Sequence, residues 1–243
     1  MTSFKEALDF HFPGSLPMKE YMARTYDLFT KYGFDDDNTF ACVSACRDEI
    51  TMPLLEETDK VWGEVFNFSS LAGSLTLGKT GFAAASSHAP IIDGLERYAF
   101  IAMPHIAISA KGEVGIVYRD GRSAPSHACG ALDAIVSEIN GGKLQLQLDM
   151  DDIEQSILKT KIFEKLTYGD KPNLVEITKI THDIIKEDLE RIIEVSDKEP
   201  FDYAVMTGVM IHGPNETNYV YPQTCYAITS DDRANKKHLS LNV

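Results

Sequence analysis

The sequence predicts an α/β fold in which helices flank a mostly parallel central sheet. Apolar runs typical of buried strands alternate along the chain with segments of helical periodicity. The 243 residues are 44% hydrophobic, which is enough for a buried core. Because the sequence contains no internal repeat and no obvious interdomain linker, we expect a single α/β domain over residues 1–243. Its N-terminal helical segment is expected at about 1–38 and its core at about 39–243.

The first half of the chain supplies two apolar runs and one long helical pattern. Residues 18–32 carry apolar side chains at helical spacing, and Gly33 follows as a C-cap. The run 39–46 is rich in small and β-prone residues and predicts a buried strand that ends near Cys46. The Gly/Ser-rich stretch 67–88 predicts a loop with a short helix, and 97–108 is a second apolar run.

The second half continues the alternation of strands and helices. Turn signals at Lys111-Gly112 and Asp120-Gly121 lie on either side of 114–118 and predict a hairpin. Asp151 and Glu154 have the spacing of a capping box for a helix that runs to about Leu166. Further helices are expected at 131–139 and 174–195, and further strands at 145–149, 201–211 and 219–228.

The charge balance excludes several classes of partner. Asp and Glu number 37 against 23 Lys and Arg, which gives a formal charge of −14. Such a chain repels phosphate backbones and anionic membrane surfaces, so we expect no nucleic acid and no membrane as partner. The sequence has no apolar stretch near the ~20 residues that span a bilayer. Its first residues lack the apolar core of a secretory signal, so we expect a cytoplasmic protein.

Cys46, His105 and Cys129 are the candidate metal ligands. Cys46 ends the first predicted strand, His105 follows the second apolar segment after Pro104, and Cys129 begins a predicted helix. Because the carboxyl ends of strands in an open α/β sheet meet at one crevice, we expect the three side chains to converge. Two thiolates and one imidazole form a known catalytic zinc set with a fourth position left for water.

Polar residues near these ligands are candidates for catalysis. Asp48 lies two residues after Cys46 and either orients a zinc-bound hydroxide or binds the metal as a fourth ligand. Arg47 and Arg122 are candidate partners for the Asp48 carboxylate. His88, at the end of the Gly-rich stretch, is a candidate proton relay, and His127 is a weaker rival of His105 as a ligand. His212 is interpreted as a residue that supports the site or lies at an interface.

The segment Gly73–Thr80 matches the phosphate-binding pattern GxxxxGK[ST]. That pattern binds nucleotide when a buried strand precedes it and a helix follows it, so that backbone N–H groups face the phosphates. Polar residues adjoin the segment on its N-terminal side, and a convincing strand ending in a magnesium-binding Asp is missing. We favour a Gly-rich loop that contains Lys79 by chance, and nucleotide binding remains an alternative.

Two motifs give the chain a resemblance to a known enzyme class. Cys46-Arg47-Asp48 resembles the β-carbonic anhydrase pattern Cys-x-Asp-x-Arg. Met103-Pro104-His105 together with Cys129-Gly130-Ala131 resembles the second zinc motif of that class, His-x-x-Cys-Gly, split by a hairpin insertion. This arrangement resembles the limiting-CO₂-inducible B/C (LCIB) family, a divergent β-type branch. Further similar blocks are Phe12-Pro13-Gly14, Ser87-His88-Ala89-Pro90, Thr207-Gly208-Val209 and Asn218-Tyr219-Val220-Tyr221-Pro222.

The resemblance implies a β-carbonic-anhydrase-like fold and the reversible hydration of CO₂ to bicarbonate by zinc-bound hydroxide. It implies Zn²⁺ held by Cys46, His105 and Cys129, and a homodimer with residues of both subunits near each active site. One position departs from the β-class pattern, because Ile50 stands where the Arg that pairs with Asp48 is expected. A catalytically silent, zinc-stabilised dimer that serves as an interaction or sensing module is therefore the main alternative.

Overall fold

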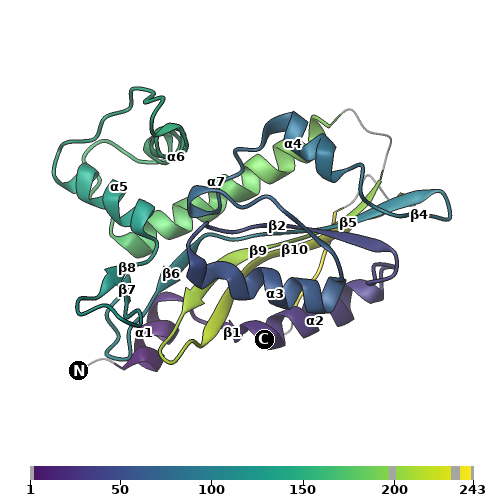
Figure 1. Cartoon of the computed structure of the whole chain (residues 1–243), viewed down its shortest axis with the longest axis horizontal. Coiled ribbons are helices and arrows are strands. Elements are labelled where there is room, and N and C mark those ends of the chain that lie inside the picture. Colours follow the sequence, from purple (N-terminus) through teal and green to yellow (C-terminus); the bar gives the residue numbers. More distant parts are fainter. Residues whose placement is uncertain (1–2, 197–200, 231–235, 242–243) are drawn as a thin grey trace.

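The computed structural model describes residues 3–196, 201–230 and 236–241. Its centre is a twisted sheet with the strand order β1-β10-β9-β5-β2-β3 (Figure 1). These strands are β1 (Leu16–Pro17), β2 (Thr39–Ser44), β3 (Val65–Asn67), β5 (Leu95–Ala102), β9 (Asp202–His212) and β10 (Asn218–Ile228). The short strands β4 (Ile91–Ile92), β6 (His105–Ala107) and β11 (Lys237–His238) pair with β5, β9 and β10.

The interior of the sheet is parallel, as the sequence predicts. β2 pairs in parallel with β3 and β5, and β9 pairs in parallel with β5 and β6. β10 returns antiparallel along β9 and pairs with β1 at its other edge. Parallel pairing requires crossover connections, and helices supply them here. The parallel strands therefore all end at the same edge of the sheet.

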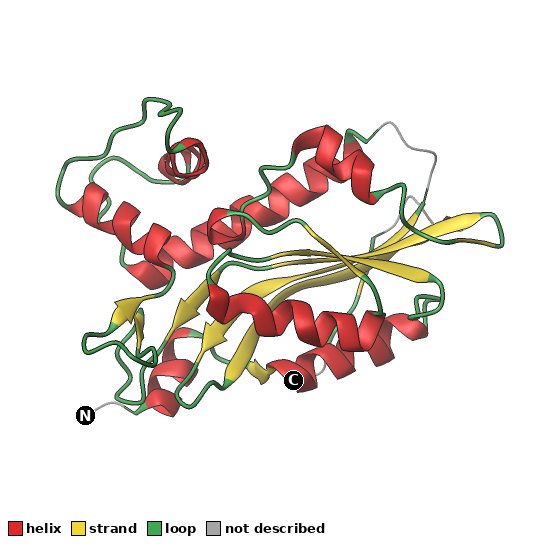
Figure 2. Ribbon diagram, viewed as in Figure 1, coloured by secondary structure: helices red, strands yellow, loops and turns green. Residues whose placement is uncertain are grey.

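Helices cover both faces of the sheet (Figure 2). They are α1 (Phe4–His11), α2 (Met18–Thr30), α3 (Met52–Trp62), α4 (Gly78–Ala85), α5 (Gly130–Asn140), α6 (Ile153–Glu164) and α7 (Leu174–Glu194). Alternate residues of β2 contact opposite layers: Ala41 and Val43 pack with α2 and α3, while Phe40 and Cys42 pack with α4 and α7. This period of two explains why the strand is apolar throughout, since both of its faces are buried.

Helix α7 is the longest helix and connects the two ends of the molecule. It begins at a capping box in which Asn173 accepts from the Glu176 backbone and Glu176 accepts from the Asn173 backbone. Its second half packs on the sheet through Ile185 and Leu189. Its first half packs against α5 and α6, which stand apart from the sheet (Figure 1). We call residues 130–170 the arm.

The strand predicted at 145–149 is wrong. These residues form an exposed irregular segment of the arm between α5 and α6. A strand needs a neighbour whose free edge can accept its backbone hydrogen bonds, and the arm stands away from the sheet edges (Figure 1). Leu146 and Leu148 therefore alternate in sequence without a buried face to fill, and Leu148 remains 60% exposed.

A small second sheet lies beside the end of β6. Strands β7 (Ile116–Val117) and β8 (Ser126–His127) pair antiparallel, which confirms the predicted hairpin although each strand is only two residues long. The hairpin loop between them carries residues 118–125. Among the helices in the described ranges, none is both long and apolar enough to cross a bilayer.

Candidate metal centre

Cys46, His105 and Cys129 come together at the carboxyl edge of the parallel strands. Cys46 follows the end of β2, His105 opens β6, and Cys129 is the N-cap of α5. Their candidate ligand atoms all lie within 4.8 Å of one another, and the two Sγ atoms are 3.9 Å apart. All three side chains are buried. The sheet thus brings together three residues that are far apart in sequence.

The atoms of this cluster fit a metal ion. His105 Nδ1 is hydrogen-bonded to His212 Nε2 at 2.9 Å, whereas His105 Nε2 is buried and has no hydrogen-bond partner within the described chain. A buried polar atom without a partner is costly unless something else binds it. Two sulfur atoms and one imidazole nitrogen are donors that zinc prefers.

The two thiols of the cluster differ in proton affinity. The hydrogen bond from Cys129, together with electrostatic attraction to the His105 ring, lowers the pKa of Cys46 against the opposing effect of burial. The hydrogen bond to Cys46 and burial raise the pKa of Cys129. The pair therefore holds one thiolate and one thiol, since two adjacent buried anions repel each other. A divalent cation would remove that repulsion and displace the remaining proton.

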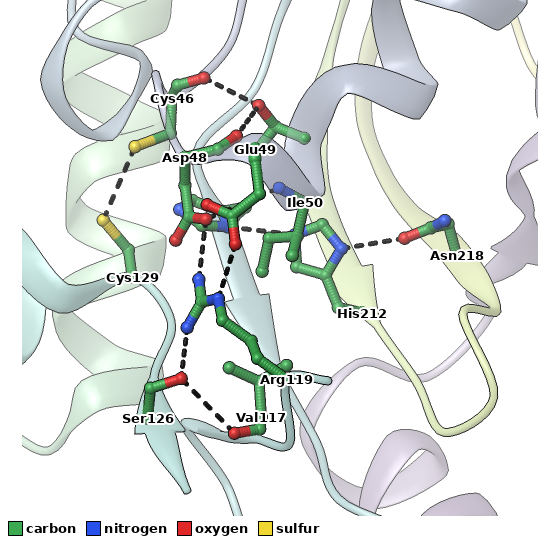
Figure 3. Close-up of polar contacts among 12 residues, drawn as sticks. Cys46, Asp48, Glu49, Ile50, Val117, Arg119, Ser126, Cys129, His212 and Asn218 are labelled. Carbon is green, nitrogen blue, oxygen red and sulfur yellow. Dashed lines mark hydrogen bonds and ion pairs between the residues drawn. The ribbon is translucent and has the colours of Figure 1, made fainter. Parts of the chain in front are cut away.

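Asp48 is held beside the cluster by Arg119 (Figure 3). Arg119 Nη2 donates to Asp48 Oδ1 at 2.7 Å, and its Nε donates to Glu49 at 2.6 Å. Its Nη1 donates to Ser126 Oγ on β8. The Ile50 backbone N–H also donates to Asp48 Oδ1, at 3.4 Å. The guanidinium is thus fixed by two carboxylates and a hydroxyl, and it directs the Asp48 side chain.

In the structure the residue that pairs with Asp48 is Arg119, not Arg47 or Arg122. Arg47 instead forms an ion pair with Glu154 of α6 at 2.8 Å, and Arg122 is exposed in the hairpin loop. Sequence reasoning missed Arg119 because it lies 71 residues from Asp48. The one signal available was a basic residue next to the Asp120-Gly121 turn of the predicted hairpin.

Two candidate histidines lie outside the cluster of their own chain. His88 is exposed and its ring contacts Phe40 and Phe66, near the start of β2. Phe40 precedes Cys46 by six residues, which is about 20 Å along an extended strand. His127 is half exposed, and its Nδ1 lies 3.0 Å from Asp133 of α5. His105 is therefore the histidine that the fold joins to the cysteines.

The Gly-rich segment packs over the cluster instead of forming a phosphate cradle. The Leu71 backbone N–H donates to the Glu154 carboxylate at 3.0 Å, so an anion already occupies this turn. The N–H groups of Gly73 and Ser74 donate to carbonyls of the same turn. A Cβ on Gly73 would lie 2.6 Å from the Met103 carbonyl oxygen, which shows how closely the two backbones approach. These contacts disfavour the nucleotide-binding alternative.

A cleft of about 1630 Å³ opens next to the Arg119–Asp48 pair. Glu49, Ile50, Arg119 and His212 lie on its wall, together with residues of the β9–β10 hairpin. His212 is a buried residue of this wall, and burial lowers its pKa to about 3, so the ring is neutral. The three residues of the cluster do not line the cleft themselves, but two residues of its wall bond to the site: His212 to His105, and Arg119 to Asp48.

Comparisons with known proteins agree with this fold. Residues 15–229 match the family model of limiting CO₂-inducible proteins B/C, β carbonic anhydrases. The chain is similar to the crystal structure of the limiting CO₂-inducible protein LCIB, with 32% identity, a TM-score of 0.79 and coverage of 96% of this chain and 97% of that one. It is also similar to PtLCIB4, a homologue of LCIB, with 24% identity, a TM-score of 0.83 and coverage of 96% and 98%. A search of curated proteins gave no significant match. The family match over most of its length shows that the chain belongs to the limiting CO₂-inducible B/C family, a carbonic-anhydrase-like family.

Proposed function

We propose that the protein is a zinc-dependent carbonic anhydrase that interconverts CO₂ and bicarbonate. Family membership supports this class of substrate. Cys46, His105 and Cys129 would hold Zn²⁺, and the buried, unpaired Nε2 of His105 is the feature of the described chain that a metal explains best. When bound, zinc supplies Lewis acidity that lowers the pKa of water toward neutrality.

The Asp48–Arg119 pair carries the catalytic part of the proposal. A carboxylate next to the metal ligands either binds the metal and closes the site or accepts a hydrogen bond from the attacking water. Arg119 binds Asp48 Oδ1 and restrains the carboxylate, and it does so from a position that the sequence pattern did not indicate. The restrained carboxylate can accept a hydrogen bond from the attacking water and so fix the orientation of that water toward CO₂.

The ligand set also bears on the pH at which the protein works. Two thiolates cancel the formal charge of a dication, so they make the bound water less acidic than three imidazoles would. We therefore expect the rate of CO₂ hydration to rise toward alkaline pH. A flat profile, or one that favours acid, would contradict this assignment of ligands.

We further propose that the protein acts as a homodimer. The arm carries several exposed apolar side chains: Leu148, Met150, Ile153 and Phe163. Large apolar side chains that stay exposed in one part of the chain are candidates for burial against a second protein molecule. His88 lies far from the cluster of its own chain, so a role in proton transfer would require that it approach the site of a partner.

The decisive experiment measures the initial rate of CO₂ hydration by stopped flow. Zinc-loaded protein is compared with chelator-stripped protein, and Asp48→Asn is compared with Asp151→Asn, an exposed carboxylate of the arm. We expect a zinc-dependent rate that Asp48→Asn abolishes and Asp151→Asn leaves unchanged. Zinc bound without any rate above the stripped control would instead support the silent, zinc-stabilised module.

A further inference from the structure

A chain of hydrogen bonds connects the candidate ligand His105 to the hairpin that joins β9 to β10. His105 Nδ1 lies 2.9 Å from His212 Nε2. His212 Nδ1 in turn lies 2.8 Å from Asn218 Oδ1 (Figure 3). His105 is the first residue of β6, His212 the last of β9, and Asn218 the first of β10. Both imidazoles are buried, and Asn218 is half-buried.

Strand pairing places these three side chains. His212 and Asn218 are direct partners in the antiparallel register of β9 and β10. β6 lies along the other side of β9, where Ala107 is opposite His212 and His105 is opposite Met210. The backbone of the sheet thus fixes the distances between the side chains, so the hydrogen bonds do not depend on mobile loops.

The direction of each hydrogen bond in this series follows from the contacts of Asn218, its last member. The Asn218 amide nitrogen donates to the Glu216 carbonyl at 3.2 Å, so Asn218 Oδ1 faces His212. An amide oxygen only accepts, and His212 Nδ1 must therefore carry a hydrogen. The partners of the two ring nitrogens of His212 are a neutral amide and an imidazole, so burial keeps the ring uncharged and its Nε2 is an acceptor.

His105 must then donate from Nδ1, which leaves a lone pair on its Nε2. This is the atom that lies among the sulfur atoms of Cys46 and Cys129 and is unpaired in the described chain. An imidazole binds a metal through a deprotonated nitrogen. The other tautomer would point a hydrogen at the position of the cation and leave two acceptors facing each other between the rings.

We propose that His212 and Asn218 are positioning residues that fix the tautomer and ring orientation of His105 for metal binding. This inference rests on the proposed metal site and adds two residues that act on the metal only through His105. Outer partners of this kind change metal affinity by roughly 10–100-fold when they are removed. Their effect therefore appears in zinc affinity itself, whether or not the protein hydrates CO₂.

The test measures the zinc dissociation constant of the full chain by competition with a chelator. We expect His212→Ala to weaken zinc binding by roughly 10–100-fold. Asn218→Leu should weaken it in the same direction, because His212 loses the acceptor that sets its tautomer. Asn218→Asp keeps an acceptor at this position and should bind zinc like the wild type. The absorption spectrum of the Co²⁺-substituted protein should change with His212→Ala and Asn218→Leu and remain wild-type with Asn218→Asp.

The matched control is His182→Gln, which alters another buried histidine. His182 hydrogen-bonds Thr207, which is on the same strand as His212. Zinc affinity should be unchanged in this variant even if its melting temperature falls. Circular dichroism establishes that each variant is folded, and if His212→Ala does not fold, the two Asn218 variants decide the question.

Two results would overturn the inference. One is a folded His212→Ala protein with wild-type zinc affinity and an unaltered Co²⁺ spectrum. The other is an Asn218→Asp protein that binds zinc as weakly as Asn218→Leu, since a merely structural role would not distinguish them. If the wild-type protein binds no zinc, the proposed function fails and this inference fails with it. If wild-type affinity is high and the variants match it, only the inference fails.

Discussion

Arg119 donates a hydrogen bond to Asp48 across 2.7 Å although 71 residues separate them in sequence. The side chains come from different parts of the fold: Asp48 precedes the short 3₁₀ turn Glu49–Thr51, and Arg119 is the second residue of the β7–β8 loop. The pair is partly shielded from solvent, with 23% of Arg119 and 15% of Asp48 exposed. An ion pair of this burial and geometry restrains a carboxylate more firmly than a surface pair does.

Replacing Arg119 by Met should reduce the rate of CO₂ hydration by roughly 10²-fold, because the freed carboxylate no longer orients the attacking water. Zinc content should remain the same, which metal analysis of the purified variant checks. Arg122→Met is the matched comparison, since Arg122 is an exposed residue of the same loop. An equal loss of rate in Arg122→Met would show that restraint of the Asp48 carboxylate is not specific to Arg119.

Removing the metal should lower the melting temperature, because the three ligands belong to segments that the metal would cross-link. With free zinc at 100 times its dissociation constant, binding adds about 2.7 kcal/mol to the free energy of unfolding. Thermal unfolding with and without chelator measures this difference. The difference should persist in Cys225→Ser and disappear in Cys129→Ser, because Cys225 lies on β10 outside the cluster. Equal melting temperatures of the wild type in both conditions would contradict the prediction.

Glu154→Gln should lower the free energy of unfolding by about 1–3 kcal/mol. The Glu154 carboxylate accepts from the Leu71 N–H and pairs with Arg47, so it ties the arm to the turn above the cluster. An amide keeps the shape but loses the charge that strengthens both bonds. Urea unfolding provides the measurement, and Glu164→Gln, an exposed position of the same helix, should remain within about 0.5 kcal/mol of the wild type. Equal effects of the two substitutions would contradict a stabilising role for the bonds of Glu154 to Leu71 and Arg47.

Gly73→Ala should destabilise the protein far more than Gly78→Ala. Both glycines have a positive φ, 78° and 63°, so both variants carry the backbone strain of an L-residue, on the order of 1 kcal/mol. Only at Gly73 would the added Cβ meet backbone, 2.6 Å from the Met103 carbonyl oxygen, whereas the space around Gly78 is open among the described atoms. The free energies of unfolding of the two variants are compared directly. Similar values would show that the backbone near Met103 shifts at little cost to make room for the added Cβ.

His182 should make the stability of the protein pH-dependent below neutral pH. Burial lowers the pKa of His182, against an opposing effect of its hydrogen bond to Asp183. The unfolded chain therefore takes up a proton near pH 6.5 that the folded chain does not, so stability is intact above this pH and falls as the pH decreases. For this one group the slope is at most about 1.4 kcal/mol per pH unit. His182→Gln should flatten the profile between pH 7.5 and 5.5, measured with chelator present so that metal release does not contribute. Parallel profiles of wild type and variant would contradict the assignment.

Local patterns in the sequence predict most of the regular elements. The helix expected at 174–195 and the strands expected at 201–211 and 219–228 are each confirmed to within one residue at either end. Their apolar periodicity is complete within a single element, so it needs no information from elsewhere. Helix α3 and the short strands β1, β3, β4 and β11 were not predicted, because they depend on neighbours that are distant in sequence. The wrong prediction of a strand at 145–149 has the same origin. Apolar and polar residues alternate there, but no neighbouring strand edge lies within reach of this segment.

The sequence by itself determined which residues are candidate metal ligands, because Cys46, His105 and Cys129 each adjoin a strand end or a helix start that local periodicity reveals. It also carried the motifs of the family. Only the tertiary structure decided that Arg119 restrains Asp48 and that His212 supports His105. The first contact joins the β7–β8 loop to the turn after β2, and the second joins β6 to β9. Their partners are set by strand register and loop path, which depend on the packing of the whole chain rather than on any local pattern.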